Sequence, residues 1–208
     1  MRIVLVAALV LVPGAVQAQR KVEANRIVST ALPAATLEVA RGMEYAGTQT
    51  FDLYGVATAE QHFFLERDGA RIKRLLWVQF EGYHASNAHT YNYRDSTIAH
   101  SGRTWHLRPA TAIRAPETES RPDSDGARMR AFLRSKGWTM GPDIVLERLV
   151  WILDTPARNE LMVIYMEDLG SQGLTAADLN EGGTSRDRWP AFAAAFHARA
   201  LAAFGVAP

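Results

Sequence analysis

Four of the six histidines in the chain fall in one segment, between residues 84 and 106. They are His84, His89, His100 and His106. Imidazole binds zinc and copper, and a chain without cysteine must supply histidine and carboxylate ligands. However, His84 and His89 are not spaced by one helical turn, and the Asn, Ser, Gly and Tyr content around them indicates a loop. We therefore expect surface histidines and no cofactor, with zinc or copper as the alternative.

A second group of polar and apolar residues belongs to two predicted strands joined at Asp68-Gly69. This dipeptide favours a tight two-residue turn, which would pair Glu66 with Arg71. Alternation along the two strands then places one mixed set on a single face. The set is His62, Phe64, Leu75, Trp77, Gln79 and Glu81. Such a mixture is typical of a small-molecule cavity, but also of a sheet face half covered by a helix.

Glu147 and Arg148 interrupt an otherwise apolar predicted strand, one on each face. A buried carboxylate at this position would have a raised pKa and could act as an acid or base. Buried charges are rarely left unpaired, so a structural ion pair is the favoured interpretation. His197, at the edge of the apolar face of the last predicted helix, is interpreted as a packing or interface residue.

The apolar spacing predicts an α+β fold: a mostly antiparallel sheet of about six to eight strands, packed by a C-terminal amphipathic helix and a shorter internal helix. We expect one domain over residues 19–208, with a lead-in at 19–35 that could include a short helix, and a loop at 115–126. Predicted strands cover residues 37–41, 48–56, 60–67, 71–83, 90–94, 104–108, 143–153 and 160–167. Predicted helices cover residues 127–136, capped by Ser124 or Asp125, and 186–204.

Residues 1–18 have the layout of a secretory signal peptide: one positive charge at Arg2, an apolar run, and a small-residue ending at Ala18. Cleavage after Ala18 would leave 22 basic and 22 acidic residues, because the whole chain has 23 and 22. This balance gives no reason to expect nucleic acid as a partner. No later apolar run could span a membrane, so we expect no stable insertion after cleavage. With no cysteine, the periplasm is the predicted location.

Three functions remain open from the sequence. The favoured one is a soluble, non-enzymatic periplasmic binding or accessory protein that holds a small apolar or amphipathic ligand on the mixed sheet face. The second is an envelope enzyme, either metal-dependent through the histidine segment or acting by acid/base chemistry through His62 and Glu81. The third is a structural envelope protein that acts through its surface, and the oligomeric state is left open. Common nucleotide-binding and hydrolase motifs do not occur in the sequence.

Overall fold

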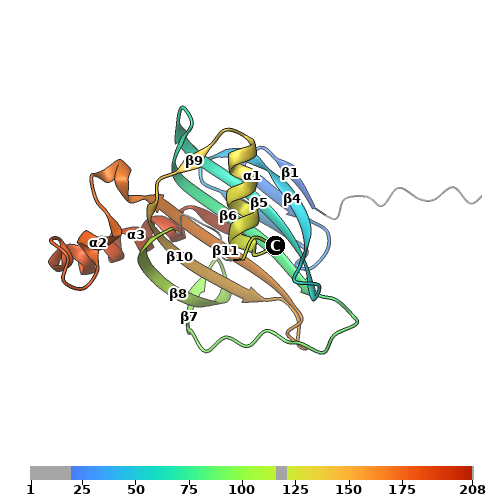
Figure 1. The fold of residues 1–208 in the computed structure, drawn as a ribbon. Coiled ribbons are helices and arrows are strands. Elements are labelled where there is room, and N and C mark those ends of the chain that lie inside the picture. The colour runs from blue at the N-terminus through green and yellow to red at the C-terminus, as the bar shows by residue number, and fades with distance from the viewer. Residues whose placement is uncertain (1–19, 116–120, 208) are drawn as a thin grey trace, which may run out of the picture.

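The computed structural model describes residues 20–115 and 121–207. The predicted signal peptide lies outside these residues, as does the middle of the predicted loop at 115–126. The described chain contains an eight-stranded sheet, a four-stranded sheet and a C-terminal helix (Figure 1). The predicted α+β class with mostly antiparallel pairing is confirmed.

The larger sheet is curved, and its neighbouring strands along the main path are antiparallel. In spatial order they are β4 (Glu44–Leu53), β5 (Ala57–Asp68), β6 (Arg71–Tyr83), β11 (Asn159–Asp168), β10 (Asp143–Ile152), β8 (Arg103–Arg114) and β7 (Ser96–His100). A short parallel strand, β9 (Thr139–Met140), pairs with β6. The central strand β11 is buried along almost its whole length, as its two-sided apolar sequence predicts.

The smaller sheet joins the two ends of the described chain. Its order is β1 (Arg20–Glu23), β2 (Arg26–Ser29), β3 (Ala35–Val39) and β12 (Phe204–Ala207). The short helix considered for residues 19–35 was therefore wrong. Val22 pairs with Ile27 across a hairpin that turns at Ala24 and Asn25, and strand pairing here overrides the local sequence signal.

The helices are α1 (Asp125–Ser135), α2 (Ala176–Leu179) and α3 (Trp189–Ala202), with 3₁₀ turns at Leu169–Gln172 and Arg186–Arg188. As predicted, α1 is capped by Ser124, whose hydroxyl accepts the N–H of Ala127. Gly137 follows α1 with a φ of 77°, a conformation that glycine adopts without strain. No helix in the described residues is long and apolar enough to cross a membrane.

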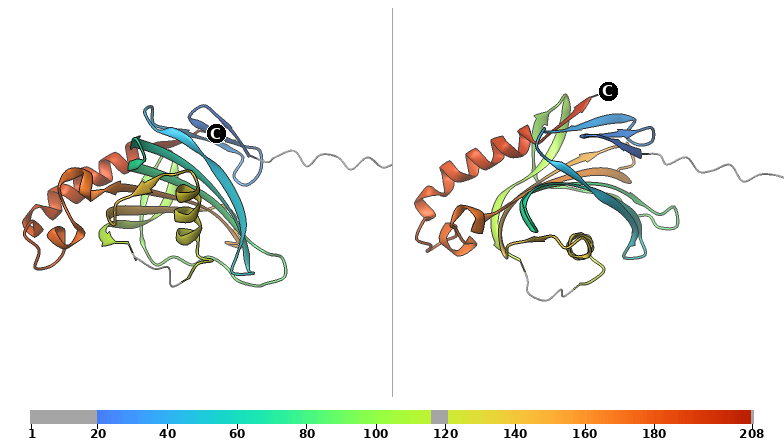
Figure 2. Two further views of the ribbon diagram at one scale, coloured as in Figure 1. Left: turned by 45° about the horizontal axis from the view of Figure 1, so that its top comes forward. Right: turned by 90° about the horizontal axis from the view of Figure 1, so that it is seen from above.

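The larger sheet packs different elements on its two faces (Figure 2). Its concave face is covered by α1, and this layer is filled by a cluster that includes Phe63, Trp77 and Met129. Its convex face packs against the smaller sheet and α3, in a larger cluster that includes Phe64, Leu37 and Phe196. The core therefore has two layers, one on each side of the sheet.

The predicted register of the β5–β6 hairpin was wrong. Asp68 pairs with Arg71 around a turn at Gly69 and Ala70, and a β-bulge then leaves Lys73 without a partner in the ladder, so that Glu66 pairs with Arg74. Because one residue has no partner, every side chain of β6 beyond the bulge shares a face of the sheet with different residues of β5 than an uninterrupted register would give. Phe63 therefore lies opposite Trp77, on the concave face.

The strand predicted at 90–94 was also wrong, because these residues form an irregular segment between β6 and β7. The predicted helix at 186–204 is shorter than expected, since it starts as a 3₁₀ turn and Phe204 belongs to β12. The strand predicted at 104–108 extends to Arg114. The sequence of this strand contains Pro109, which obscured its continuation.

Candidate functional site

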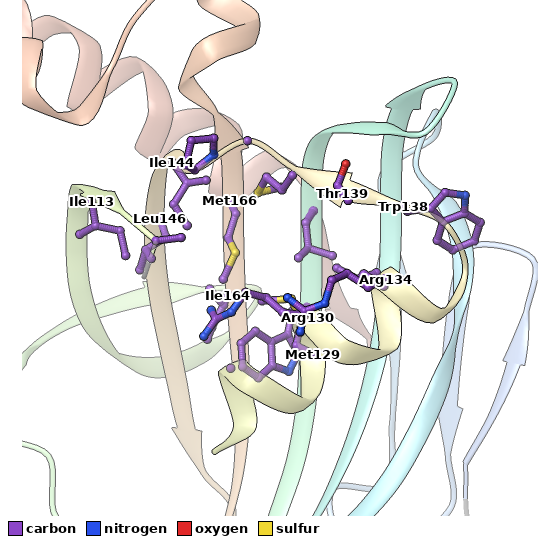
Figure 3. Close-up of a pocket in the computed structure, with 18 of the residues that line it drawn as sticks. Ile113, Met129, Arg130, Arg134, Trp138, Thr139, Ile144, Leu146, Ile164 and Met166 are labelled. Carbon is purple, nitrogen blue, oxygen red and sulfur yellow. The ribbon is translucent and has the colours of Figure 1, made fainter. Parts of the chain in front are cut away.

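A cavity of about 450 Å³ lies between α1 and the concave face of the larger sheet (Figure 3). Its volume is in the range of small-molecule sites, roughly 300–1,000 Å³. Met129, Arg130 and Arg134 contribute from α1, while Ile164 and Met166 contribute from β11. The other apolar lining residues are Leu75, Trp77, Ile113, Ala115, Leu133, Trp138, Met140, Pro142, Ile144 and Leu146.

Local sequence patterns explain how this wall forms. Met129 and Leu133 are one helical turn apart, so both face the sheet from α1 and both are buried. On the sheet, alternation presents Leu75 and Trp77 of β6 to the same side as Ile164 and Met166, their neighbours in the ladder. The cavity is therefore formed by regular elements on both sides.

The mixed set predicted as one ligand-binding face is divided between the two faces of the sheet. The structure places Leu75 and Trp77 in the wall of the cavity. By contrast, Phe64 packs in the convex core, and His62 pairs with Val78 on that face. The prediction that these four share a face was wrong, because the bulge at Lys73 reverses the relation between β5 and β6.

Gln79 and Glu81 lie on the concave face beyond the cavity, in a chain of amide and carboxyl groups. Gln49 donates to Gln61 (2.7 Å), Gln61 donates to Gln79 (2.8 Å), and Gln79 donates to Glu81 (2.7 Å). Both Gln61 and Gln79 are fully buried. Their hydrogen-bonding groups are therefore satisfied by one another across three strands, which fixes the side chains in place.

Glu160 lies opposite Glu81 in the β6–β11 ladder, so two carboxyl groups are neighbours on the concave face. Tyr93 donates to Glu160 at 2.7 Å, and Tyr91 donates to Glu81 at 2.8 Å. Burial, with a smaller contribution from the nearby Glu81, raises the pKa of Glu160 to about 8, although the hydrogen bond from Tyr93 opposes this effect. Burial also raises the pKa of Glu81. At neutral pH, Glu160 is therefore mainly protonated.

His62 belongs to a different network on the convex face. Its Nε2 lies 2.7 Å from a Glu60 carboxylate oxygen, and its Nδ1 lies 3.4 Å from the hydroxyl of Tyr45. Arg20 completes this group with an ion pair to Glu60 at 2.8 Å. The acid/base pair that was considered, His62 with Glu81, is therefore not brought together by the fold.

The four histidines of the predicted metal segment have four separate environments. The Nε2 of His84 lies 3.2 Å from the Thr58 hydroxyl, and the ring of His89 packs on Tyr83. His100 is within 3.0 Å of the Phe204 carbonyl, and the ring of His106 packs on Tyr93. Within residues 20–115 and 121–207, no group of three or more histidine and carboxylate side chains is placed to hold a metal ion.

Glu147 and Arg148 lie on opposite faces of β10, as predicted. Glu147 is almost fully buried, and its Oε1 lies 2.7 Å from the Nδ1 of His197 on α3. Burial raises the pKa of the Glu147 carboxyl, and the contact with His197 opposes this effect. Arg148 lies near Asp95, with 3.5 Å between a guanidinium nitrogen and the carboxylate.

Two contributors to the concave face were not identified from the sequence: the α1 arginines and Glu160. The sequence could have indicated Arg130 and Arg134, since they flank the apolar residues of a predicted amphipathic helix. Glu160 lies at the end of an apolar predicted strand, where a charged residue is common and does not indicate a site. Tyr93 reaches Glu160 across 67 positions of sequence, a contact that local pattern cannot show.

Comparison of the chain with protein-family models, curated proteins and solved structures gives no match.

Proposed function

We propose that this protein binds a small apolar or amphipathic molecule in the cavity between α1 and the concave face. The observation that carries the proposal is the cavity itself: about 450 Å³ with a mostly apolar wall. Apolar side chains that line an unfilled space lose the contacts of a packed core, and an apolar ligand restores them. Most of the wall residues come from α1 and from the strands behind it, so the site is held mainly by packed elements.

Binding can be measured with phenylnaphthylamine, an uncharged apolar fluorophore whose emission rises in apolar surroundings. We expect saturable binding to one site on the wild-type protein. The variant Leu146→Trp places a larger side chain in the cavity wall, and we expect it to weaken binding by roughly tenfold or more, because steric overlap replaces apolar contact.

Leu107→Trp provides the matched control, since Leu107 is a partly buried leucine on the convex face of the neighbouring strand β8. Urea unfolding would establish that both variants are folded. The proposal fails if the wild-type protein shows no saturable binding. It also fails if Leu146→Trp and Leu107→Trp bind the fluorophore with equal affinity.

We also propose that the protein acts in the periplasm. The support is the signal-peptide layout of residues 1–18 and the absence of cysteine from the chain. Mass spectrometry of the protein isolated from the producing cells tests this directly. A chain that begins at Gln19 supports export and cleavage, whereas a chain that begins at Met1 contradicts them.

A further inference from the structure

Buried side-chain nitrogens without a hydrogen-bond partner are concentrated beside the cavity. The described residues contain four such atoms, and three of them belong to Trp77 (Nε1), His106 (Nδ1) and Arg148 (Nε). Arg148 and His106 lie on the adjoining strands β10 and β8, and Trp77 lies on β6, with β11 between β6 and β10. Buried polar atoms are nearly always paired, so unpaired ones rarely gather in one place. Their grouping points to a ligand that accepts hydrogen bonds.

The strand register shows that these residues are neighbours on the concave face. Ile164 pairs with Trp77 on one side and with Arg148 on the other. His106 pairs with Val150, which places it diagonally next to Arg148. Trp77 and Ile164 also line the cavity, so the group of unpaired nitrogens lies next to the cavity wall.

Tyr93 lies between two of these residues and completes the group. Its ring is 5.3 Å from the Arg148 guanidinium carbon and 5.5 Å from the ring of His106. We name these four residues, Trp77, Tyr93, His106 and Arg148, the polar recess. The concave face therefore changes along its length from an apolar cavity to a group of polar and aromatic side chains.

The charge of Arg148 is weakly compensated. Its contact with Asp95 is 3.5 Å long, at the limit of a hydrogen bond. Glu160, which accepts from Tyr93 at the same place, is mainly protonated at neutral pH because burial raises its pKa to about 8. The Arg148 side chain keeps 23% of its surface exposed, so part of the guanidinium can be reached. A partly buried arginine with one long carboxylate contact is suited to receive an anion.

We infer that the polar recess binds the anionic head group, a carboxylate or a phosphate, of an amphipathic ligand whose apolar chain fills the cavity. This inference rests on the proposed function, because it assigns the polar end of the same ligand. The guanidinium of Arg148 supplies the positive charge and a planar pair of donors. The indole N–H of Trp77 offers a further donor to the head group, and the Nδ1 of His106 offers another in the tautomer that carries its proton on Nδ1.

Isothermal titration with three single-chain probes tests the inference: decanoate, decyl phosphate and decanol. We expect the wild-type protein to bind at least one of the two anions roughly 10- to 100-fold more tightly than decanol, as one charge-assisted contact predicts. The preferred anion distinguishes a carboxylate ligand from a phosphate ligand. In Arg148→Met, this preference over decanol should be lost while decanol binding is retained.

Arg103→Met is the matched control, because Arg103 packs over the ring of Trp151 on the convex side of the sheet and lies outside both the cavity and the recess. It should keep the preference for anions. In Asp95→Asn, which leaves Arg148 in place and removes its carboxylate neighbour, anion affinity should rise several-fold. The inference is overturned if decanol binds as tightly as both anions, or if Arg148→Met keeps the preference for anions. Absence of binding by all three probes would overturn the proposed function as well.

Discussion

The two faces of the larger sheet both carry buried or partly buried carboxyl groups, but these groups have different partners. On the convex face, each carboxylate contacts a basic side chain within 2.8 Å: Glu60 with Arg20, Glu147 with His197, and Glu167 with Arg199. On the concave face, Glu81 and Glu160 accept hydrogen bonds from tyrosines. These three convex carboxylates are thus charge-paired, whereas Glu81 and Glu160 on the concave face have pKa values that burial raises.

This difference separates groups that support the fold from groups available to a ligand. A paired charge on the convex face fixes α3 or the smaller sheet against the larger sheet, and the core around it is closely packed. The concave face combines a cavity, the mainly protonated Glu160 and unpaired buried nitrogens. Perturbed groups beside a cavity are the usual features of a binding site.

The largest expected effect concerns Phe63 and Phe64, adjacent residues of β5 that are both fully buried on opposite faces. Replacing either by alanine should lower the free energy of unfolding by about 3–5 kcal/mol. Because Phe63 pairs with Trp77 of the cavity wall, decanol should restore part of the lost stability in Phe63→Ala and none of it in Phe64→Ala. Urea unfolding with and without decanol measures this. Equal restoration in the two variants would contradict the separation of the faces.

A second comparison uses one carboxylate from each face. Glu167 accepts two hydrogen bonds from Arg199, at 2.7 and 3.0 Å, and one from Tyr165. Glu167→Gln should therefore lower stability by about 2 kcal/mol, since a buried charge-assisted group is lost. Glu160→Gln should cost less than about 1 kcal/mol, because a neutral amide replaces a mainly protonated acid. Urea unfolding at neutral pH measures both. If Glu160→Gln were the more damaging change, Glu160 would be a charged structural group.

The pH dependence of stability distinguishes the two faces further. The pKa of Glu160 is raised from 4.5 to about 8 in the folded protein, so the folded state binds a proton that the unfolded state releases. Its contribution to stability is complete below pH 4.5 and is lost as the pH rises toward about 8. Glu160→Gln should reduce this fall by up to about 1.4 kcal/mol per pH unit. Unfolding curves across this window test the sign, and an unchanged slope would contradict it.

The sequence was sufficient to predict those strands and helices whose pattern lies within a short stretch of residues. Alternation identified the long strands β5 and β6, sequences that are apolar on both faces identified β10 and β11, and the apolar spacing around Met129 and Leu133 identified α1. These features depend on residues within one or two turns or one strand of each other, so a single sequence carries them.

The arrangement of the site was not predictable to the same degree, because it depends on one residue and on long-range contacts. Lys73 forms a bulge that no dipeptide signal marks, yet it determines whether His62 or Phe63 shares a face with Trp77. The neutral state of Glu160 depends on its burial beneath a distant segment that contributes Tyr93. The chemistry of a sheet face can be predicted from sequence only when the register is known.

The smallest expected effect concerns the end of α1, the element that covers the concave face. The Ser124 hydroxyl accepts the N–H of Ala127 in the first turn, and Ser124→Ala should lower stability by about 1 kcal/mol. Since α1 supplies Met129 to the cavity wall, fraying of its first turn should also speed hydrogen exchange in α1 and weaken decanol binding slightly. Amide exchange in the convex core near Phe196 should speed up only as much as the loss of global stability requires. Equal acceleration in α1 and around Phe196 would mean that the helix opens only with the whole fold, and the concave layer would then be as rigid as the convex one.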